Sequence, residues 1–456
     1  MKKVVFIMMI FAAISPLWAQ YSGFSFNALM PNAIEKTIIR ELQFPASISY
    51  VETQTEHYFV YHDGSINPLE VVEINPNLYV KDFVISDDTV FFCGRNPVTD
   101  MGFVGHFEIS SFFSLTSSYT YTGNPMFCPN GHVASFNKMT TFSLNGARKM
   151  GLIGEDPTGQ QVVAEIRYSP SISTYDYTIG ELPATSNETF MDIALTDNYV
   201  VTAGFRTVNN KRGINIRVYL KSTMLQVGVG PQDSSACFTS TMGVSFDFYD
   251  DQLLLSHHKL DNFSLAAYAW DTNIPPLAAT YIGIFNIGST YSVTNAFTAL
   301  TSQYKQSGNW MLRGLTPVEQ SSHFYLLQNA EMPNYNNLVN MVFEMDNNTF
   351  VSAAGGVYKP IRVNSDLTLQ SIDAHPSYTG FVTNGNRASD PPYLKYYDAT
   401  VNAVKCTMQD SVLFYAPTVL KHSPHQYFNI TYGTEMNFIT YLGSYMQLPE
   451  EIECKE

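Results

Sequence analysis

A phrase repeated along the chain is the feature that most restricts its fold. Asp82-Phe-Val-Ile-Ser-Asp-Asp88 followed by Val90-Phe-Phe-Cys-Gly94 returns as Asp192-Ile-Ala-Leu-Thr-Asp-Asn198 followed by Val200-Val-Thr-Ala-Gly204, 110 positions later. A degraded copy occupies residues 246–256. Self-similarity of this kind is typical of chains built from stacked, similar units. The sequence therefore predicts a repeat architecture, which says more about shape than about chemistry.

Most of the chain has the local pattern of short β-strands. Runs rich in Val, Ile, Phe, Tyr and Thr alternate with turns of Gly, Pro, Asn and Asp, as in antiparallel sheets. Only residues 33–42 show a weak helical periodicity. The chain is therefore expected to be all-β.

A strand-like segment that follows a turn recurs about every 54 residues. A repeat of about 50 residues with four short strands has the size of a β-propeller blade. The sequence thus predicts an all-β β-propeller of seven four-stranded blades, and the spacing favours seven blades over six or eight. The recurring segments are 102–109, 160–168, 213–220, 263–270, 323–328, 361–369 and 426–432.

The first complete unit illustrates the expected blade. Asp87 and Asp88 separate its first two strands and suit a tight turn, because aspartate tolerates positive φ. From the inside outward, the four strands are expected at 82–86, 89–93, 102–109 and 117–122.

The chain is expected to form one domain, because no Pro/Ser-rich linker divides it. Ring closure by an N-terminal strand would hide the edges of the sheets from aggregation. A separate small N-terminal cap is the alternative. The predicted division is a signal peptide at 1–19, a closing segment or cap at 20–77, repeated blades at 78–433 and a C-terminal closing segment at 434–456.

The start of the chain predicts export. Lys2 and Lys3 precede an apolar run at 4–14, and the small residue Ala19 marks a cleavage point, as in a secretory signal. The run is too short to span a bilayer, so no transmembrane segment is expected. No cysteine stands at the cleavage point to carry a lipid. The mature protein is expected in the periplasm or outside the cell.

The charge argues against a nucleic-acid partner. Removing Lys2 and Lys3 takes the formal net charge from −15 to −17, and no basic run interrupts the acidic surplus. Nucleic-acid binding depends on Lys and Arg that neutralise phosphates. The expected partner is a protein or a carbohydrate, and the protein itself is expected to be a monomer.

The five cysteines lack the close spacing of a zinc cluster. Their odd number leaves at least one thiol free in an exported protein. Cys406 and Cys454 are a candidate disulfide pair that would hold the C-terminus. Cys93 and Cys237 are at least as well explained as small apolar residues buried in strands.

The quoted phrases carry a resemblance. The blade phrase "DFVISDDTVFFCG…GFVGHFEIS", with "DIALTDNYVVTAG…GINIRVYLK", resembles uncharacterised exported bacterial β-propeller proteins over residues 78–433. The chain departs from WD40 and kelch propellers, because the pair Trp270-Asp271 does not recur and the double glycine Gly355-Gly356 occurs once in a plausible place. The resemblance implies an architecture and no catalytic residues.

Ligands of propellers usually meet the face that carries the loops between second and third strands. The seven loops assigned to that face contain seven cations and five acids, an excess of positive charge in an acidic protein. The contrast indicates an anionic ligand, for example an acidic glycan, although loop charges are solvated by default. These loops are expected at 95–101, 155–159, 205–212, 257–262, 314–321, 355–360 and 417–425.

Four histidines in these loops are candidate metal ligands or general bases. Unliganded surface histidines are the favoured interpretation, because His422-Ser-Pro-His425 lacks the helix of a metalloprotease motif. No metal and no cofactor are therefore expected. The candidate ligand-binding residues are Arg95, Arg206, Lys211, Arg212, His257, His258, Lys421, His422 and His425.

Asp82 and Asp192 begin inner strands and allow two interpretations. Their carboxylates either face the channel as an acid/base pair or hold neighbouring blades by bonding backbone amides. The second interpretation is favoured, because architecture alone explains a residue that recurs with the repeat.

The leading functional hypothesis is a non-catalytic exported propeller that binds a partner protein or carbohydrate through its loop face. The alternative is a hydrolase or lyase acting on a polysaccharide at the mouth of the central channel, with Asp and His residues as acid and base. A structural part of an envelope assembly is a third possibility. The sequence has no nucleophile elbow, Walker loop, dinucleotide fingerprint or EF-hand loop.

Overall fold

The computed structural model describes most of the chain between Phe24 and Glu453. The predicted signal peptide at 1–19 lies outside the described residues. The described residues are 24–29, 32–43, 46–62, 70–113, 118–123, 126–127, 133–144, 147–170, 174–182, 187–208, 211–220, 239–240, 246–257, 262–271, 277–287, 293–302, 311–317, 323–331, 338–346, 357–358, 361–363, 368–374, 381–387, 393–399, 412–414, 420–421, 429–435, 439–444 and 450–453.

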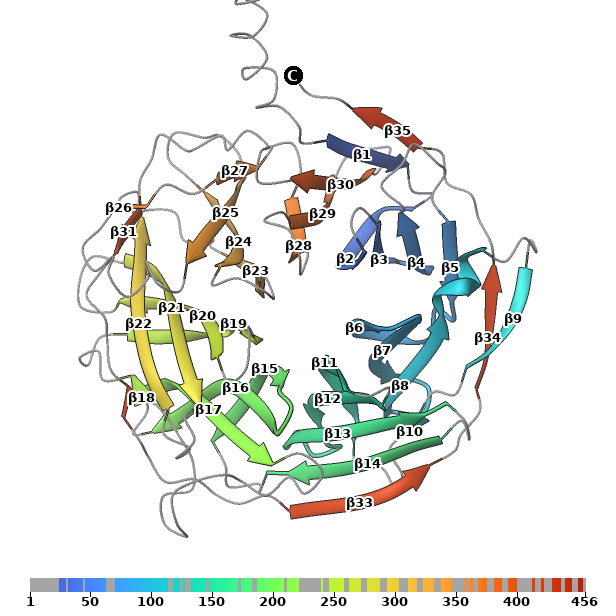
Figure 1. Cartoon of the computed structure of the whole chain (residues 1–456), viewed down its shortest axis with the longest axis horizontal. Coiled ribbons are helices and arrows are strands. Elements are labelled where there is room, and N and C mark those ends of the chain that lie inside the picture. Colours follow the sequence, from blue (N-terminus) through green and yellow to red (C-terminus); the bar gives the residue numbers. More distant parts are fainter. Residues whose placement is uncertain are drawn as a thin grey trace, which may run out of the picture.

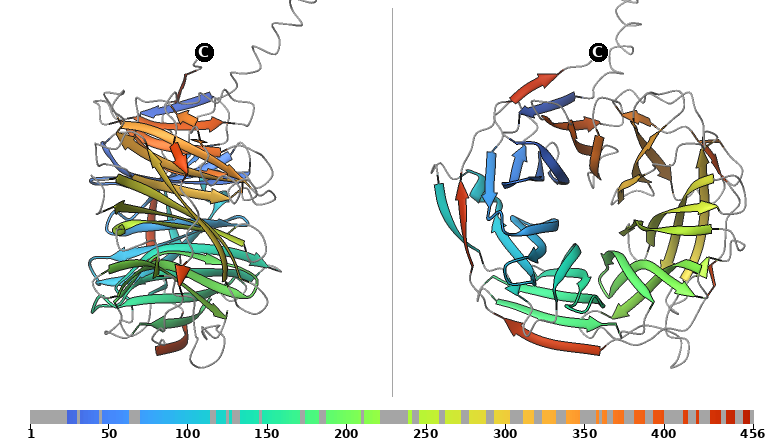
Figure 2. Two further views of the ribbon diagram at one scale, coloured as in Figure 1. Left: turned by 90° about the vertical axis from the view of Figure 1, so that its left-hand side faces the viewer. Right: turned by 180° about the vertical axis from the view of Figure 1, so that it is seen from behind.

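The described strands form a ring of sheets around a central axis (Figure 1). Seven sheets have three to six strands each, and the first three strands of each sheet run outward from the axis in chain order. Views from the side and from behind show the same ring (Figure 2). The all-β propeller predicted from the sequence is confirmed.

The first four sheets follow one another along the chain. The first contains β2 (Ile34–Gln43), β3 (Ala46–Thr53), β4 (His57–His62) and β5 (Glu70–Ile74). The second contains β6 (Tyr79–Ser86), β7 (Thr89–Asn96), β8 (Met101–Glu108) and β10 (Met126–Phe127), with a 3-10 helix at Ile109–Phe113 after β8. The third contains β11 (Ser135–Leu144), β12 (Ala147–Glu155), β13 (Gln161–Ser169) and β14 (Thr174–Glu181), and the fourth β15 (Glu188–Leu195), β16 (Tyr199–Val208) and β17 (Lys211–Leu220).

The last three sheets complete the ring. The fifth contains β19 (Phe246–His257), β20 (Asn262–Asp271), β21 (Leu277–Ile287) and β22 (Val293–Ser302), and the sixth β23 (Met311–Pro317), β24 (His323–Glu331), β25 (Leu338–Asp346) and β27 (Ile361–Val363). The seventh contains β28 (Thr368–Ala374), β29 (Phe381–Arg387) and β30 (Tyr393–Ala399), and the N-terminal strand β1 (Phe24–Leu29) pairs antiparallel with β30.

Five strands near the C-terminus lie along the outer edge of the ring, and we call them the C-terminal belt (Figure 1). They are β31 (Val412–Phe414), β32 (Leu420–Lys421), β33 (Asn429–Glu435), β34 (Ile439–Ser444) and β35 (Glu450–Glu453). β31 pairs with β22 and with β26 (Val357–Tyr358), and β33 pairs with β14. β32 pairs with β18 (Thr239–Ser240), β34 with β9 (Ser118–Gly123) and β35 with β1.

Several expected elements differ from the structure. Residues 33–42, the one segment with helical periodicity, form strand β2, because its apolar side chains pack within an antiparallel sheet. The segment at 117–122 is not the fourth strand of its blade, since β9 pairs with the belt and β10 takes that place. The segment at 426–432 is likewise an outer strand added to the third sheet.

The N-terminal segment also differs from expectation. Residues 34–74 form a complete four-stranded sheet, whereas a closing segment or cap was expected at 20–77. The degraded copy at 246–256 lies within the single strand β19, with a register shift between Phe248 and Leu253.

The repeated glycines stand opposite a bulge of the inner strand. Gly94 pairs with Val80 immediately before the register shift of β6, and Gly204 pairs with Phe190 before the shift of β15. A Cβ at either glycine would lie 1.9 Å from a backbone oxygen of the inner strand. Only glycine allows this approach. Asp87 has a φ of 51°, which confirms the expected turn.

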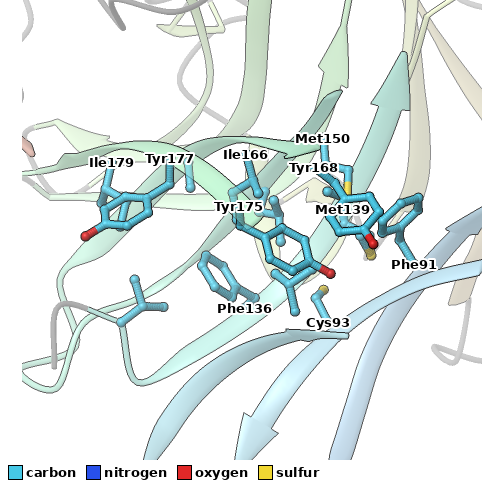
Figure 3. Packing of buried hydrophobic residues seen from close by; sticks show 14 of the residues in the cluster. Phe91, Cys93, Phe136, Met139, Met150, Ile166, Tyr168, Tyr175, Tyr177 and Ile179 are labelled. Atoms are coloured by element: carbon cyan, nitrogen blue, oxygen red, sulfur yellow. The ribbon is translucent and has the colours of Figure 1, made fainter. Parts of the chain in front are cut away.

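Adjacent sheets pack through buried apolar side chains (Figure 3). Phe91 and Cys93 of β7 meet Phe136 and Met139 of β11 and aromatic residues of the third sheet. Cys93 is free and fully buried, as expected, and burial raises the pKa of its thiol well above the usual value. The other cysteines, Cys128, Cys237, Cys406 and Cys454, lie outside the described residues.

Candidate functional site

The inner strands of all seven sheets line one central cavity of about 390 Å³. β2, β6, β11, β15, β19, β23 and β28 each contribute side chains to it. These seven strands are the innermost of the ring and surround its axis (Figure 1). This central cavity is therefore the candidate site.

A β-bulge determines which side chains reach this cavity. In six inner strands the register shifts by one residue, and the residue after the shift lines the cavity. Such a bulge re-aims side chains and occurs near functional sites. In chain order these residues are Lys36, Asp82, Lys138, Asp192, Gly314 and Ser371. Charges therefore alternate over the first four sheets and are absent from this position in the last two.

Asp82 joins three neighbouring sheets. Its Oδ1 lies 2.8 Å from Arg40 Nη2 of β2, and its Oδ2 accepts a hydrogen bond from the backbone N–H of Met139 in β11 at 3.2 Å. Oδ1 also accepts from the N–H of Phe83 at 3.0 Å. The carboxylate is 2% exposed. These bonds hold the three sheets together.

Asp192 repeats this arrangement two sheets further along the chain. Its Oδ2 accepts a hydrogen bond from the N–H of Leu255 in β19 at 2.8 Å, and its Oδ1 accepts from the N–H of Ile193 at 2.9 Å. Burial raises the pKa of the Asp192 carboxyl. The two repeated aspartates thus bond the backbone of the next sheet, which confirms the favoured interpretation.

Lys36 presents an amine at the wall of the cavity. Its Nζ donates hydrogen bonds to the backbone oxygens of Val80 and Lys81 in the next sheet, both at 3.0 Å. Burial lowers the pKa of Lys36 to about 8, although the nearby carboxylates of Glu52 and Asp82 act in the opposite direction. More of this amine is therefore unprotonated near neutral pH than that of an exposed lysine.

The charges around the cavity have a positive balance. Five cationic side chains and three carboxylates line it, within a chain whose formal net charge is −15. Lys138 Nζ lies 4.0 Å from Asp82 Oδ2, a longer separation than the 2.8 Å between Arg40 Nη2 and Asp82 Oδ1. Asp373 Oδ1 accepts a hydrogen bond from Thr316 Oγ1 at 2.9 Å. The cations are Lys36, Arg40, Lys81, Lys138 and Arg313, and the carboxylates are Asp82, Asp192 and Asp373.

Two arginines predicted to bind ligand have acidic partners of their own. Arg95 is exposed at the end of β7 and forms an ion pair with Asp100. Arg206 Nε lies 3.8 Å from Oε1 of Glu188, a buried carboxylate that also pairs with Arg217 at 2.7 Å. Neither arginine lines the central cavity.

The other predicted residues that the structure describes lie on three strands. Lys211 and Arg212 begin β17, Lys421 lies in the belt, and the ring of His257 packs 5.1 Å from that of Phe263. His257 ends β19, the first strand of its sheet, whereas the loop face was assigned to turns that follow a second strand, such as that between β7 and β8. His258, His422 and His425 lie outside the described residues.

The described residues contain no cluster of three or more His, Cys, Asp or Glu side chains that could hold a metal ion. No helix among them has the length and apolar character needed to cross a bilayer.

Sequence reasoning missed the cationic wall of the cavity. Lys36 and Lys138 occupy the position of Asp82 and Asp192 in their own inner strands, but the residues around them do not resemble the repeated phrase. Alignment of the seven inner strands on the bulge would have exposed the alternation of charge.

Comparisons with known proteins leave the site open. No family model and no curated protein matches the chain. Among solved structures, the chain is similar to the β-propeller domain of the Trilobed protease from Pyrococcus furiosus. The similarity has a TM-score of 0.44 and 9% identity, and covers 80% of this chain and 96% of that domain. It concerns the fold alone.

Proposed function

We propose that this protein is a non-catalytic, exported binding propeller whose central cavity takes a small anionic ligand, such as the acidic end of a carbohydrate. The observation that carries the proposal is the surplus of cations around the cavity of a strongly acidic chain. A concave site lined by one sign of charge concentrates ligands of the opposite sign. The predicted signal segment supports export.

The bonds of the carboxylates strengthen this argument. Asp82 and Asp192 already accept hydrogen bonds from backbone amides, and Asp82 is also paired with Arg40. Their negative charge is therefore engaged in holding the sheets together. Lys138 is held less closely, at 4.0 Å from Asp82, so it can donate to a ligand without breaking a short ion pair.

The size of the cavity limits the ligand. A volume of about 390 Å³ lies at the lower end of the range of about 300–1,000 Å³ for small-molecule sites. That volume suits a ligand of monosaccharide size. A longer acidic glycan would enter by one end.

Titration calorimetry with glucuronate and with neutral glucose tests the proposal. Glucuronate is expected to bind and glucose to bind at least tenfold more weakly, because a charge-assisted hydrogen bond contributes about 1.5–3 kcal/mol. Lys138→Gln is expected to weaken glucuronate binding about tenfold. The matched control is Arg95→Gln, which removes a cation of the loop face and should leave the affinity unchanged. Equal binding of the two sugars, or a loss only in Arg95→Gln, would overturn the proposal.

A second candidate function, a polysaccharide hydrolase or lyase, is favoured by Lys36. An amine with a pKa of about 8 in the cavity has a suitable basicity for proton abstraction near neutral pH. The release of reducing ends from polygalacturonate measures this activity. If the unchanged protein releases reducing ends and Lys36→Arg does not, the binding proposal is replaced by the enzyme. If neither protein releases reducing ends, the binding proposal stands.

A further inference from the structure

We propose that Lys36 Nζ is a nucleophile that captures a carbonyl carbon of the bound ligand as an imine, so that the cavity selects anions bearing an aldehyde or ketone. The inference rests on the proposed function, because the cations of the cavity would hold the ligand beside this amine. A reducing acidic sugar has both groups.

The hydrogen bonds of Lys36 suit a neutral amine. Its Nζ bonds two backbone oxygens, those of Val80 and Lys81, both at 3.0 Å. An ammonium group has three N–H donors, whereas a neutral amine has two donors and one lone pair. The two carbonyl oxygens accept both N–H groups of the neutral amine and leave its lone pair for an electrophile.

The charged groups around Lys36 come from three sheets. Glu52 of β3 and Asp82 of β6 favour the ammonium form, while Lys81 of β6 and Lys138 of β11 oppose it. Burial is the largest effect, and it lowers the pKa of Lys36 to about 8. Near pH 8 about half of the molecules therefore hold a neutral amine, whereas an exposed lysine with a pKa of about 10.4 is almost wholly charged.

The reaction needs no reagent other than the two groups. The nitrogen lone pair adds to the carbonyl carbon, the C=O electron pair moves to oxygen, and a proton passes from nitrogen to that oxygen. Loss of water from this carbinolamine forms the C=N bond, and addition of water reverses it. Lys138 Nζ, on the inner strand of the third sheet, lines the same cavity and would hold the carboxylate during capture.

Trapping with glyoxylate and cyanoborohydride tests the inference on the full chain. Glyoxylate is a small anion with an aldehyde, and cyanoborohydride reduces its imine to a stable secondary amine that peptide mass spectrometry locates. At low glyoxylate concentration, Lys36 is expected to be modified at least tenfold faster than the other lysines. The rate at Lys36 should rise with pH to about 8 and then level off, following its pKa.

Two variants and a neutral probe complete the design. Lys36→Arg, which keeps a cation and donors, should lose the fast modification, whereas Arg95→Gln, which changes a cation outside the cavity, should retain it at Lys36. Acetaldehyde, which lacks the charge, should show little preference for Lys36. Even modification of all lysines, or fast modification of Lys138, would overturn the inference.

A separate measurement distinguishes failure of the inference from failure of the proposed function. Methyl glucuronide retains the carboxylate and lacks a free carbonyl, so calorimetry with it reports the anion site alone. Binding of methyl glucuronide together with even lysine modification would overturn the imine and leave the anion site standing. Selective capture at Lys36 without any binding of methyl glucuronide or glucuronate would support the nucleophile and overturn the acidic-sugar ligand.

Discussion

At the scale of single residues, the repeated phrase is explained by one bulge and its two neighbours. The aspartate after the bulge, Asp82 or Asp192, accepts a hydrogen bond from the backbone of the next sheet. The glycine opposite the bulge, Gly94 or Gly204, makes room for the inner strand. The repetition of these residues was visible in the sequence, and so was the structural role of the aspartates. The role of the glycines was not, because it depends on a close approach between two strands.

Gly94→Ala tests this explanation. The new Cβ would lie 1.9 Å from Tyr79 O, so the backbone must shift. We expect a loss of about 3 kcal/mol in the free energy of unfolding, the upper part of the usual cost of overpacking. Gly159→Ala is the control, since Gly159 has a φ of 82° and nothing within 4 Å of the added Cβ. It should cost only about 1 kcal/mol from backbone strain. Chemical denaturation measures both, and equal losses would refute the steric explanation.

At the scale of elements, the C-terminal belt is the largest departure from the sequence-based interpretation. Residues 426–432 have the alternation of a blade strand, but β33 of the belt pairs with the outer edge of β14. Main-chain hydrogen bonds are the same for any strand-like segment, so side-chain pattern alone does not identify the partner strand. The belt covers edges that would otherwise remain open to other chains.

Removal of the belt strands should destabilise the ring. Ending the chain after residue 428 deletes β33, β34 and β35 and exposes the edges of β14, β9 and β1. We expect a loss of several kcal/mol, since each hydrogen bond contributes about 0.5–1.5 kcal/mol, and self-association detectable by light scattering. Ending the chain after residue 449 deletes β35 alone and should have a much smaller effect. A shortened protein that remains monomeric and equally stable would show that the belt is dispensable.

At the scale of the whole molecule, the first and last inner strands meet through polar contacts. The N–H of Thr37 in β2 donates to Gln370 Oε1 of β28 at 2.7 Å, and the N–H of Ile39 donates to Ser371 Oγ at 3.1 Å. Asn384 of β29 accepts from Thr37 Oγ1 at 3.1 Å and donates to Ser49 Oγ at 3.0 Å. This polar seam joins segments more than 300 residues apart in the sequence.

Asn384→Ala is expected to loosen the ring at this seam. The side chain is fully buried, so its loss leaves polar partners unsatisfied at a cost of about 1–3 kcal/mol. Asn215→Ala is the control, because Asn215 donates to Glu188 Oε2 at 2.6 Å within the fourth sheet. Hydrogen exchange should accelerate in β2 and β28 together for Asn384→Ala, and only in the fourth sheet for Asn215→Ala. Local exchange around β29 alone in Asn384→Ala would contradict the role of the seam.

The sequence by itself determined the strands, the turns and the propeller class of this protein. Strand alternation and turn residues such as Asp87 are local properties, and the repeat multiplies them. Only the tertiary structure decided which residues surround the cavity and which edges the belt covers. Lys36 and Lys138 join Asp82 and Asp192 at the axis because bulges in separate strands turn them inward, and no local pattern records that convergence.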